Sequence, residues 1–351
     1  MMIKRYSLLV VLLVFVTVSC SDTVDGPDPL ETASVFVTNE GNFSDGNGSV
    51  TSYDPQAASS QTQAFQNENN RPMAGLVQSS EVSGDRMFLA VNSTDKVEVV
   101  NKLTLESLAT VEFNAPPTAV EVVDETAYVT TYNFETQNDQ VYLFDLSTME
   151  VADDSIEVSS APRDIVVAGG SLYVSTNSGN TVEVIDPETN TVERSITVGQ
   201  GPSQLIVDNE DRIWVACNGR VSYDESTEDV PGSVHVLNGQ TGEVIGSVES
   251  PDIAATGYNY RLALNENAQE AYFLSDGVSV IDMNNFTLSD TKLTTRSFNA
   301  IGYFAAQNQL YLGQSNGYSQ AGKALLYDLE GTAVDSFTAG IAPNGFQFTQ
   351  E

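Results

Sequence analysis

The sequence predicts an all-β fold, a seven-bladed β-propeller whose blades each contain four strands. A short apolar strand, a variable loop, a second strand and a turn opened by Asp or Asn recur seven times along the chain. Successive turns are separated by 41 to 52 residues. The residues that open them are Asp54, Asn101, Asp145, Asp186, Asn238, Asp282 and Asp328. A unit of this size cannot bury its own apolar face, so the copies must stack on one another.

Each repeat divides into four strands bounded by Gly, Asn, Asp and Pro. In the clearest copy, which begins at Ser171, the alternation of apolar and polar residues is typical of strands. The second strand of each blade is expected to start near Ser34, Arg86, Thr126, Ser171, Arg212, Glu270 and Gln309. The inner strands are expected near Leu76, Ala119, Ile165, Gln204, Arg261, Ala300 and Phe346.

The order of these strands predicts a closed ring. The repeats start with a second strand and finish with an inner strand, at 345–349. This last strand can complete the blade begun by 34–38, which joins the two ends of the array. Closure removes the unpaired edges that an open array of strands would expose.

The first 19 residues have the features of a signal peptide. Lys4 and Arg5 precede an apolar stretch at 8–18, which is short for a membrane-spanning helix. The Ser-Cys pair at 19–20 resembles the lipobox of bacterial lipoproteins, although Thr17 replaces the usual aliphatic residue. The resemblance implies acylation of Cys20, an acidic tether over 20–33 and a propeller over 34–351. An ordinary secretory signal with an incidental cysteine is the alternative.

The chain is strongly acidic. Its formal net charge is −34, and loss of Lys4 and Arg5 with the signal peptide would leave 12 basic and 48 acidic residues, or −36. Nucleic acid is therefore excluded as a partner, because phosphates require a basic surface. The acidic residues are scattered over turns, which favours a solvated coat over a dedicated cation-binding surface.

The sequence contains few groups that could carry catalysis. His235 is the single histidine, and its SVHVL setting predicts a blade strand. Cys217, the one cysteine besides Cys20, lies in an apolar strand. The segment from Asp45 to Ser49 resembles part of a calcium loop but lacks the closing Glu. No transition-metal cluster, phosphate loop or dinucleotide fingerprint occurs, so we predict no catalytic residue, no metal and no cofactor.

Two sets of loops should meet on one face of this propeller. One set joins a fourth strand to the next inner strand, and the other joins a second strand to a third. Four of the seven connections in the first set carry an arginine, and these are half of the eight arginines in the chain beyond residue 19. They are Arg71, Arg163, Arg261 and Arg296. Guanidinium groups suit carboxylate or phosphate, so we predict an anion site, with ties between neighbouring blades as the alternative.

The same loops are rich in aromatic residues. The candidates for ligand contact are Tyr132, Phe134, Tyr258, Tyr260 and Phe298, and Phe43, Tyr223 and Tyr318 lie in equivalent loops. Tyr and Phe offer a large contact area to a sugar, a macrocycle or a protein. Packing within their own loops is the alternative for each of them. The longest loop, 218–232, is a candidate lid or partner contact.

Several segments together resemble a known family. LYVSTNSGNTVEVIDPETNTV, within the repeat that begins at Ser171, is similar to the YVTN-type repeat of bacterial propellers. SVFVTNEGNF, GSVTSYDP and APRDIVV resemble surface lipoproteins built on that repeat. The resemblance covers about 34–351 and implies a location at the outer membrane. Some lipoproteins of this broad group capture cobalamin above an outer-membrane transporter, although no cobalamin-specific motif is found here.

We therefore expect a non-enzymatic, lipid-anchored propeller of the cell envelope. It would bind a small anionic or macrocyclic nutrient, cobalamin-like in one version, or a membrane-protein partner such as an outer-membrane transporter. One alternative is a propeller enzyme of the lactonase or dehydrogenase-subunit type, against which the scarcity of histidine argues. A structural or adhesive surface spacer is the other. The periplasmic and outer faces of the outer membrane both remain open as locations.

Overall fold

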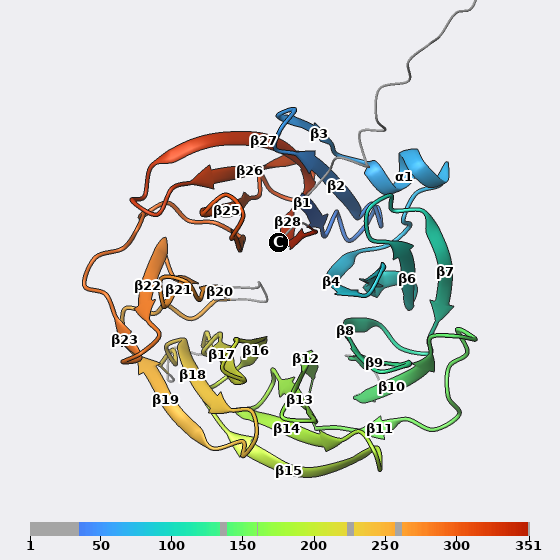
Figure 1. Ribbon diagram of the computed structural model, residues 1–351, viewed down its shortest axis with the longest axis horizontal. Coiled ribbons are helices and arrows are strands. Elements are labelled where there is room, and N and C mark those ends of the chain that lie inside the picture. The colour runs from blue at the N-terminus through green and yellow to red at the C-terminus, as the bar shows by residue number, and fades with distance from the viewer. Residues whose placement is uncertain (1–34, 134–138, 160, 223–227, 257–261, 350–351) are drawn as a thin grey trace, which may run out of the picture.

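The computed structural model describes residues 35–133, 139–159, 161–222, 228–256 and 262–349. These residues form seven four-stranded antiparallel sheets. The sheets are arranged as blades around a central axis (Figure 1). The predicted seven-bladed propeller is confirmed.

The blades are numbered along the chain, and their strands are given from the axis outward. Blade 1 contains β28 (Pro343–Phe348), β1 (Val35–Asn39), β2 (Ser49–Asp54) and β3 (Ser59–Gln61); blade 2 contains β4 (Val77–Ser83), β5 (Arg86–Val91), β6 (Lys96–Asn101) and β7 (Ser107–Glu112). Blade 3 contains β8 (Pro117–Val123), β9 (Thr126–Thr131), β10 (Gln140–Asp145) and β11 (Ile156–Glu157); blade 4 contains β12 (Pro162–Ala168), β13 (Ser171–Thr176), β14 (Thr181–Asp186) and β15 (Thr191–Thr197). Blade 5 contains β16 (Pro202–Val207), β17 (Arg212–Cys217), β18 (Ser233–Asn238) and β19 (Val244–Glu249); blade 6 contains β20 (Leu262–Asn265), β21 (Glu270–Leu274), β22 (Val278–Asp282) and β23 (Thr287–Leu288). Blade 7 contains β24 (Ala300–Phe304), β25 (Gln309–Gln314), β26 (Ala321–Tyr327) and β27 (Ala333–Ile341).

The ring closes through the C-terminal strand. β28 pairs antiparallel with β1, from Val35 opposite Phe348 to Asn39 opposite Pro343. The first and last described strands of the chain thus share one blade, as the order of the repeats predicts. A single blade made from both ends ties the array together without a covalent link.

The hydrophobic core lies between the blades. Seven clusters of buried apolar residues occur in the described chain, and each combines residues of two neighbouring blades. In blade 4, Leu172 and Val174 contribute to the cluster shared with blade 3, whereas Tyr173 contributes to the cluster shared with blade 5. Alternate residues of a strand point to opposite sides of a sheet, so both sides of a blade are covered. Burial on both sides explains why the second strands are continuously apolar.

Within the described residues, two short helical segments interrupt the β pattern. The helix α1 (Ala64–Asn69) follows β3, and a single 3-10 turn, η1 (Asn92–Thr94), follows β5. Ala64 and Phe65 of α1 are buried in the cluster between blades 1 and 2. α1 was not predicted from the sequence, because a helix of six residues is too short to show a helical period.

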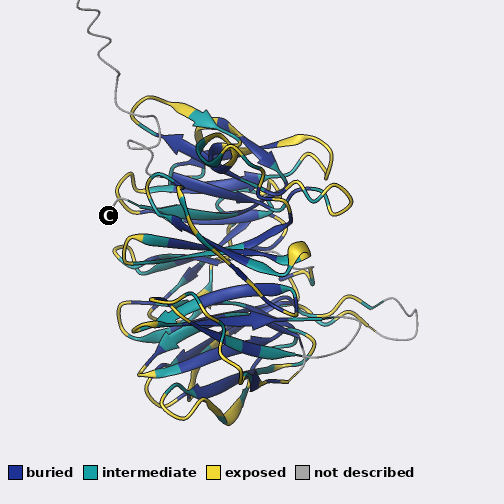
Figure 2. Ribbon diagram, turned by 90° about the vertical axis from the view of Figure 1, so that its right-hand side faces the viewer, coloured by how far each residue is buried: buried dark blue, intermediate teal, exposed yellow. Residues whose placement is uncertain are grey.

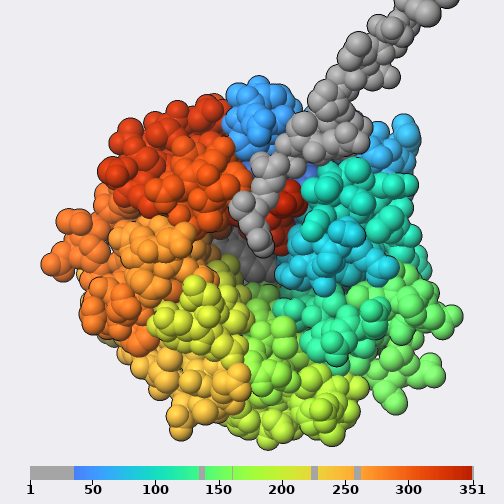
Figure 3. Space-filling model, viewed as in Figure 1, coloured from blue at the N-terminus to red at the C-terminus, as the bar shows by residue number. Residues whose placement is uncertain are grey.

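The propeller has two distinct faces, seen edge-on in Figure 2. The turn face carries the hairpins between the first and second and between the third and fourth strands of each blade. The mouth face carries the two loop sets described above. Val35 and Phe348 pair at the turn-face end of blade 1, so the described chain begins and ends on that face. Figure 3 shows the blades packed side by side into a disc.

Candidate functional site

The mouth face is shaped by a backbone hydrogen bond that recurs between the two loop sets. The first residue after a second strand donates its N–H to a carbonyl just before the inner strand of the same blade. The pairs are Glu40 to Ala342 (2.9 Å), Asn92 to Leu76 (2.8 Å), Tyr132 to Pro116 (3.1 Å), Asn177 to Ala161 (2.9 Å) and Asn218 to Gly201 (2.8 Å). The side chains of both loop sets therefore project around one opening, as the sequence analysis expects.

A cavity of about 380 Å³ lies at this opening on the side of blades 1 to 4. We call it the mouth cavity. It is lined by Glu40, Gln78, Asn92, Thr118, Tyr132, Ala161, Pro162, Arg163, Asn177 and Ser178. Its volume is at the small end of the range for small-molecule sites, roughly 300–1,000 Å³.

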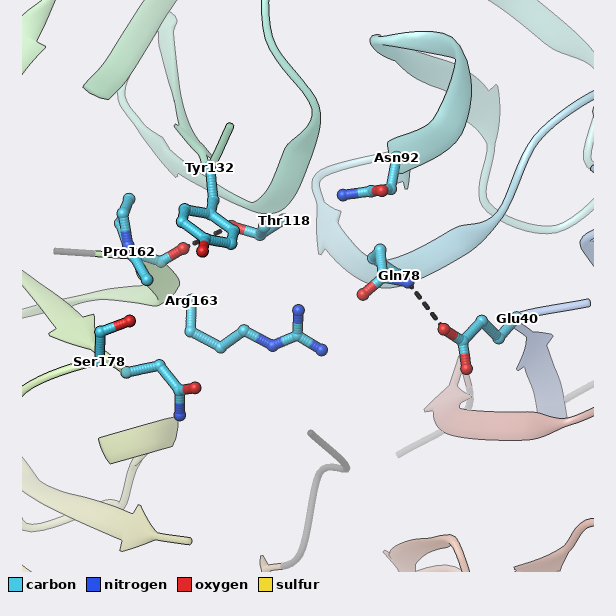
Figure 4. A pocket seen from close by; sticks show the side chains of 10 residues that line it. Glu40, Gln78, Asn92, Thr118, Tyr132, Pro162, Arg163 and Ser178 are labelled. Carbon is cyan, nitrogen blue, oxygen red and sulfur yellow. Dashed lines mark hydrogen bonds between the residues drawn. The ribbon is translucent and has the colours of Figure 1, made fainter. Parts of the chain in front are cut away.

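Two of the predicted ligand-contact residues, Tyr132 and Arg163, come together in the mouth cavity. Tyr132 follows β9, and Arg163 is the second residue of β12. The chain turns into β12 at Ala161, whose backbone is in the left-handed region (φ 57°) and whose N–H donates to Asp139 Oδ2 at 2.8 Å. This turn fixes the start of the strand, and the Arg163 side chain extends into the cavity (Figure 4).

The opposite wall is acidic and rich in hydrogen-bond acceptors. Figure 4 shows Gln78 and Glu40 across the cavity from the backbone of Arg163. Gln78 Nε2 donates to Glu40 Oε1 at 3.2 Å, which holds the carboxylate in place. The two charged groups, Arg163 and Glu40, come from blades 4 and 1 and lie on different walls of the cavity (Figure 4). The cavity thus separates a cation from an anion.

Asparagines complete the lining and tie neighbouring blades. Asn92 Nδ2 donates to Pro117 O at 3.3 Å, and Asn177 Nδ2 donates to Pro202 O at 3.3 Å, in each case on the next blade. The amide nitrogen is therefore engaged in the blade contact. This contact with the next blade is made after the second strands of blades 2 and 4, and the same two asparagines supply polar groups to the mouth.

Arg71 does not line the mouth cavity. Its guanidinium pairs with Glu98, which is fully buried on β6, and donates to Ser107 Oγ at 2.9 Å on the outermost strand of blade 2. It also lies 4.9 Å from the centre of the Phe65 ring. These contacts correspond to the alternative that the sequence analysis kept open, a tie within the structure, and they direct the side chain toward the outside of the ring.

Arg296 and Phe298 lie together but apart from the mouth cavity. Arg296 donates to Gln314 Oε1, and its guanidinium lies 5.8 Å from the centre of the Phe298 ring. Phe298 lines a separate depression of about 340 Å³ beside Ser275 and Asp276 of blade 6. The structure therefore does not join the described arginines into one ring.

The remaining predicted residues cannot be placed. Phe134, Tyr223, Tyr258, Tyr260, Arg261 and Cys20 lie outside the described residues. Residues 223–227 of the longest loop, 218–232, also fall there.

Phe43 and Tyr318 are exposed aromatic residues in the mouth-face loops of blades 1 and 7. Phe43 is 79% exposed and Tyr318 is 61% exposed. Asn42 Nδ2 donates to Tyr318 O at 2.7 Å, so the loops of blades 1 and 7 are fastened to each other. Neither ring lines the mouth cavity.

Sequence reasoning missed Glu40, Gln78, Asn92 and Asn177 as cavity residues. Asn92 and Asn177 could have been found, because each directly follows a second strand. Glu40 directly follows the second strand β1 and could have been found in the same way. Gln78, the second residue of the inner strand β4, had no such signal. Their role depends on which blades meet around the cavity.

A second cavity, of about 350 Å³, lies one residue deeper along the inner strands. It is the central channel, and Glu81 of β4 and Asp164 of β12 line it. Burial raises the pKa of Glu81 to about 8, and the charge of Glu121 adds to the shift. Burial likewise raises the pKa of Glu121 to about 7 and that of Asp164 to about 6. All three residues are half-buried on inner strands, and the surrounding protein disfavours their charged forms.

The single histidine occupies a blade strand, as predicted. His235 is buried on β18, where Nε2 lies 3.2 Å from Ser233 Oγ. Burial lowers the pKa of His235. Within the described residues, no group of three or more His, Cys, Asp or Glu side chains is arranged to hold a metal ion. In the same part of the chain, no helix is long and apolar enough to span a membrane.

Solved structures share this fold at low sequence identity. A quinoprotein alcohol dehydrogenase-like protein of Bacteroides thetaiotaomicron aligns with a TM-score of 0.70 and 11% identity, over 92% of this chain and 79% of that protein. A protein of unknown function from Desulfotomaculum acetoxidans aligns with a TM-score of 0.65 and 13% identity, over 90% of this chain and 98% of that protein. The Pan2 WD40 domain of Neurospora crassa aligns with a TM-score of 0.58 and 12% identity, over 80% of this chain and 86% of that domain. Likeness at this identity shows the fold alone.

The protein is therefore a β-propeller, and its sequence places it in a family. The profile of the family described as a domain of unknown function, DUF5074, matches residues 33–228, which is more than half of the chain. The chain belongs to the DUF5074 family. A curated protein, the PE-PGRS family protein PE_PGRS18 of Mycobacterium tuberculosis, is 53% identical over 47 residues, or 13% of this chain. That match spans 10% of the mycobacterial protein.

Proposed function

We propose that this protein is a non-enzymatic, lipid-anchored propeller of the cell envelope that captures a small ligand with an anionic group at its mouth. The observation that carries the proposal is the position of Arg163, whose side chain extends into a cavity of about 380 Å³. In a chain with 14 basic and 48 acidic residues, a guanidinium in such a cavity is a local site for an anion. Tyr132 adds a flat apolar surface beside it.

Capture would be by a largely preformed site. The backbone around the cavity is held by the bond from Asn177 N to Ala161 O and by the contact between Gln78 and Glu40. A preformed site loses little conformational entropy on binding, which favours affinity for a small ligand. A corrinoid is too large to enter a cavity of this size and would have to lie over it. Smaller anionic nutrients would fit inside.

The anchor would be acylated Cys20, and the location would be the outer membrane, with the cell surface favoured over the periplasmic face. Because Val35 lies on the turn face, a tether from Cys20 would join the propeller there. The mouth would then remain open to ligand and to an envelope partner such as an outer-membrane transporter. The resemblance to YVTN-type surface lipoproteins supports this arrangement. Metabolic labelling with a palmitate analogue tests it: the wild type should be labelled in membranes, and Cys20→Ser should not.

Thermal unfolding of the chain from residue 21 onward tests the ligand proposal. The panel should contain corrinoids, haem, sugar acids, organic acids, amino acids and short peptides. A ligand that binds only the folded state raises the melting temperature as its concentration exceeds its dissociation constant. We expect a shift with at least one anionic compound, lost in Arg163→Ala and kept in Arg220→Ala, which removes an exposed arginine elsewhere on the mouth face. A panel without any shift would contradict ligand capture and favour a protein partner or a spacer role.

A further inference from the structure

The mouth cavity offers more than a site for an anion, because its two charges lie on different walls. Arg163 belongs to blade 4, and Glu40 belongs to the loop after β1 in blade 1. Figure 4 shows the guanidinium directed across the cavity toward the side on which Gln78 and Glu40 lie. A ligand lying between them meets a cation at one end and a carboxylate at the other.

Glu40 is fixed in this position by the fold. Its backbone N–H donates to Ala342 O at 2.9 Å, and its carboxylate accepts from Gln78 Nε2 at 3.2 Å. Gln78 is itself buried, so its amide cannot swing away into solvent. A simple anion entering the cavity would approach this fixed carboxylate and be repelled by it.

The neutral lining also favours a ligand that donates hydrogen bonds. Asn92 and Asn177 use their Nδ2 groups for the carbonyls of the next blade, at 3.3 Å in each case. The acceptor oxygen is the part of each amide that these bonds leave for other partners. Asn92 lies in blade 2 beside Gln78, whereas Asn177 lies in blade 4 with Arg163 (Figure 4). An acceptor oxygen on the Glu40 side suits an ammonium group, which has three N–H donors.

Building on the proposed function, we propose that the mouth cavity selects zwitterionic ligands of the amino acid or short peptide class. The carboxylate of the ligand would pair with Arg163, and its ammonium group would pair with Glu40. Tyr132 would pack against the apolar part between them. The cavity volume of about 380 Å³ suits a molecule of dipeptide size.

Three forms of one dipeptide test the contributions of its carboxylate and its ammonium group separately. Alanyl-alanine carries both, N-acetyl-alanyl-alanine keeps only the carboxylate, and alanyl-alanine amide keeps only the ammonium group. Titration calorimetry on the chain from residue 21 onward should show the unmodified dipeptide binding about tenfold or more tightly than either blocked form. This ratio is what the loss of one charge-assisted contact in a partly buried site would produce.

Two variants test which side chain of the cavity binds each end of the ligand. In Arg163→Ala, the advantage of the free carboxylate over the amide should disappear. In Glu40→Gln, which keeps an oxygen for the bond from Gln78, the advantage of the free ammonium over the acetylated form should disappear. Arg220→Ala, on the same face and outside the cavity, should leave all three affinities unchanged. Circular dichroism melting curves of the variants verify that each is folded.

The outcomes distinguish this inference from the proposed function. If N-acetyl-alanyl-alanine binds as tightly as the free dipeptide, selection for a zwitterion is wrong while anion capture stands. The same conclusion follows if only non-zwitterionic acids or corrinoids bind. If no compound of either panel binds, both proposals fail.

Discussion

The turn face and the mouth face are built from the same repeats, but they differ in how uniformly their blades are made. On the turn face, the last residue of the third strand accepts backbone N–H groups two and three residues later in blade after blade. Examples are Asp54 with Gln56 (2.7 Å) and Ala57 (3.1 Å), Asn101 with Leu103 (2.9 Å) and Thr104 (3.1 Å), and Asn238 with Gln240 (3.0 Å) and Thr241 (2.8 Å). On the mouth face, the equivalent arginines have unrelated partners.

This difference separates what maintains the fold from what can vary for function. A turn bonded to its own backbone is satisfied by Asp or Asn in any blade, so one solution is repeated. The mouth loops have no such local requirement. Arg71 pairs with the buried carboxylate of Glu98, whereas Arg163 lines a cavity. Loops supported by a rigid ring are free to diverge, and binding residues are found on such loops.

The largest difference in the free energy of unfolding is expected between variants of Arg71 and Arg163, two arginines in equivalent loops. Arg71→Ala should lower the free energy of unfolding by about 3 kcal/mol, because Glu98 would remain buried with only the Lys96 Nζ, 3.6 Å away, as an ionic partner. Arg163→Ala should change it by less than about 0.5 kcal/mol. Urea denaturation of both variants measures the contrast.

A second substitution tests the reason for that difference. Glu98→Gln in the Arg71→Ala background should restore part of the lost stability, since the fully buried residue 98 would then carry no charge that needs the missing guanidinium. If Arg71→Ala left the free energy of unfolding unchanged but abolished ligand binding, Arg71 would instead belong to the binding site.

The channel carboxyls should make the protein more stable in mild acid than in mild base. Their folded pKa values, about 8 for Glu81 and about 7 for Glu121, lie above the ordinary value of 4.5. The stabilising contribution of the protonated forms is complete below about pH 4.5 and is lost as the pH rises toward 8. Glu81→Gln should therefore raise the free energy of unfolding by about 2 kcal/mol at pH 8, after allowance for screening by channel water, and by little at pH 4.5.

Urea denaturation at both pH values measures this effect. Glu188→Gln, an exposed change on the turn face, is the control and should show no such dependence. An equal gain for Glu81→Gln at both pH values would point to packing instead of ionisation.

At lower pH an opposite effect is expected on the turn face, where hydrogen bonds from Ser147 and Thr148 lower the pKa of Asp145 to about 2. That contribution is lost as the pH falls below about 4.

A smaller effect should come from the turn face itself. Asn238→Ala removes the acceptor for Gln240 and Thr241 N–H and should cost about 1 kcal/mol of unfolding free energy. Asn238→Asp, the residue that other blades use, should remain within about 0.5 kcal/mol of the wild type. Thermal melts of the two variants distinguish them, and an equal loss in both would mean that the side chain amide has another role.

The smallest effect is expected at the exposed rim of the mouth. Phe43→Ser should change the free energy of unfolding by less than about 0.5 kcal/mol, because the ring is 79% exposed. Phe65→Ala, at a ring that is 1% exposed, should cost about 3 kcal/mol or more. Chemical denaturation of the pair provides the comparison. A loss above about 1 kcal/mol for Phe43→Ser would show that its loop supports the blades.

The number of blades, the closure of the ring and the turn face were determined by the sequence alone, because each depends on local signals. Strand alternation and Asp or Asn turns act over a few residues, and their period is visible along the chain. The final strand at 345–349 could be assigned to blade 1 because the repeats otherwise lacked an inner strand there. The Arg163 and Tyr132 loops were also predicted, since the order of strands fixes the face on which they project.

The composition of the mouth cavity was decided only by the tertiary structure. Glu40 and Arg163 are separated by 123 positions in the chain, and no local pattern connects them. They line one cavity because closing seven blades into a ring brings the loops of blades 1 and 4 to the same opening. Whether an arginine meets a carboxylate or a cavity likewise depends on what the neighbouring strands and blades place beside it. The repeat pattern does not contain this information, because it is a property of tertiary packing.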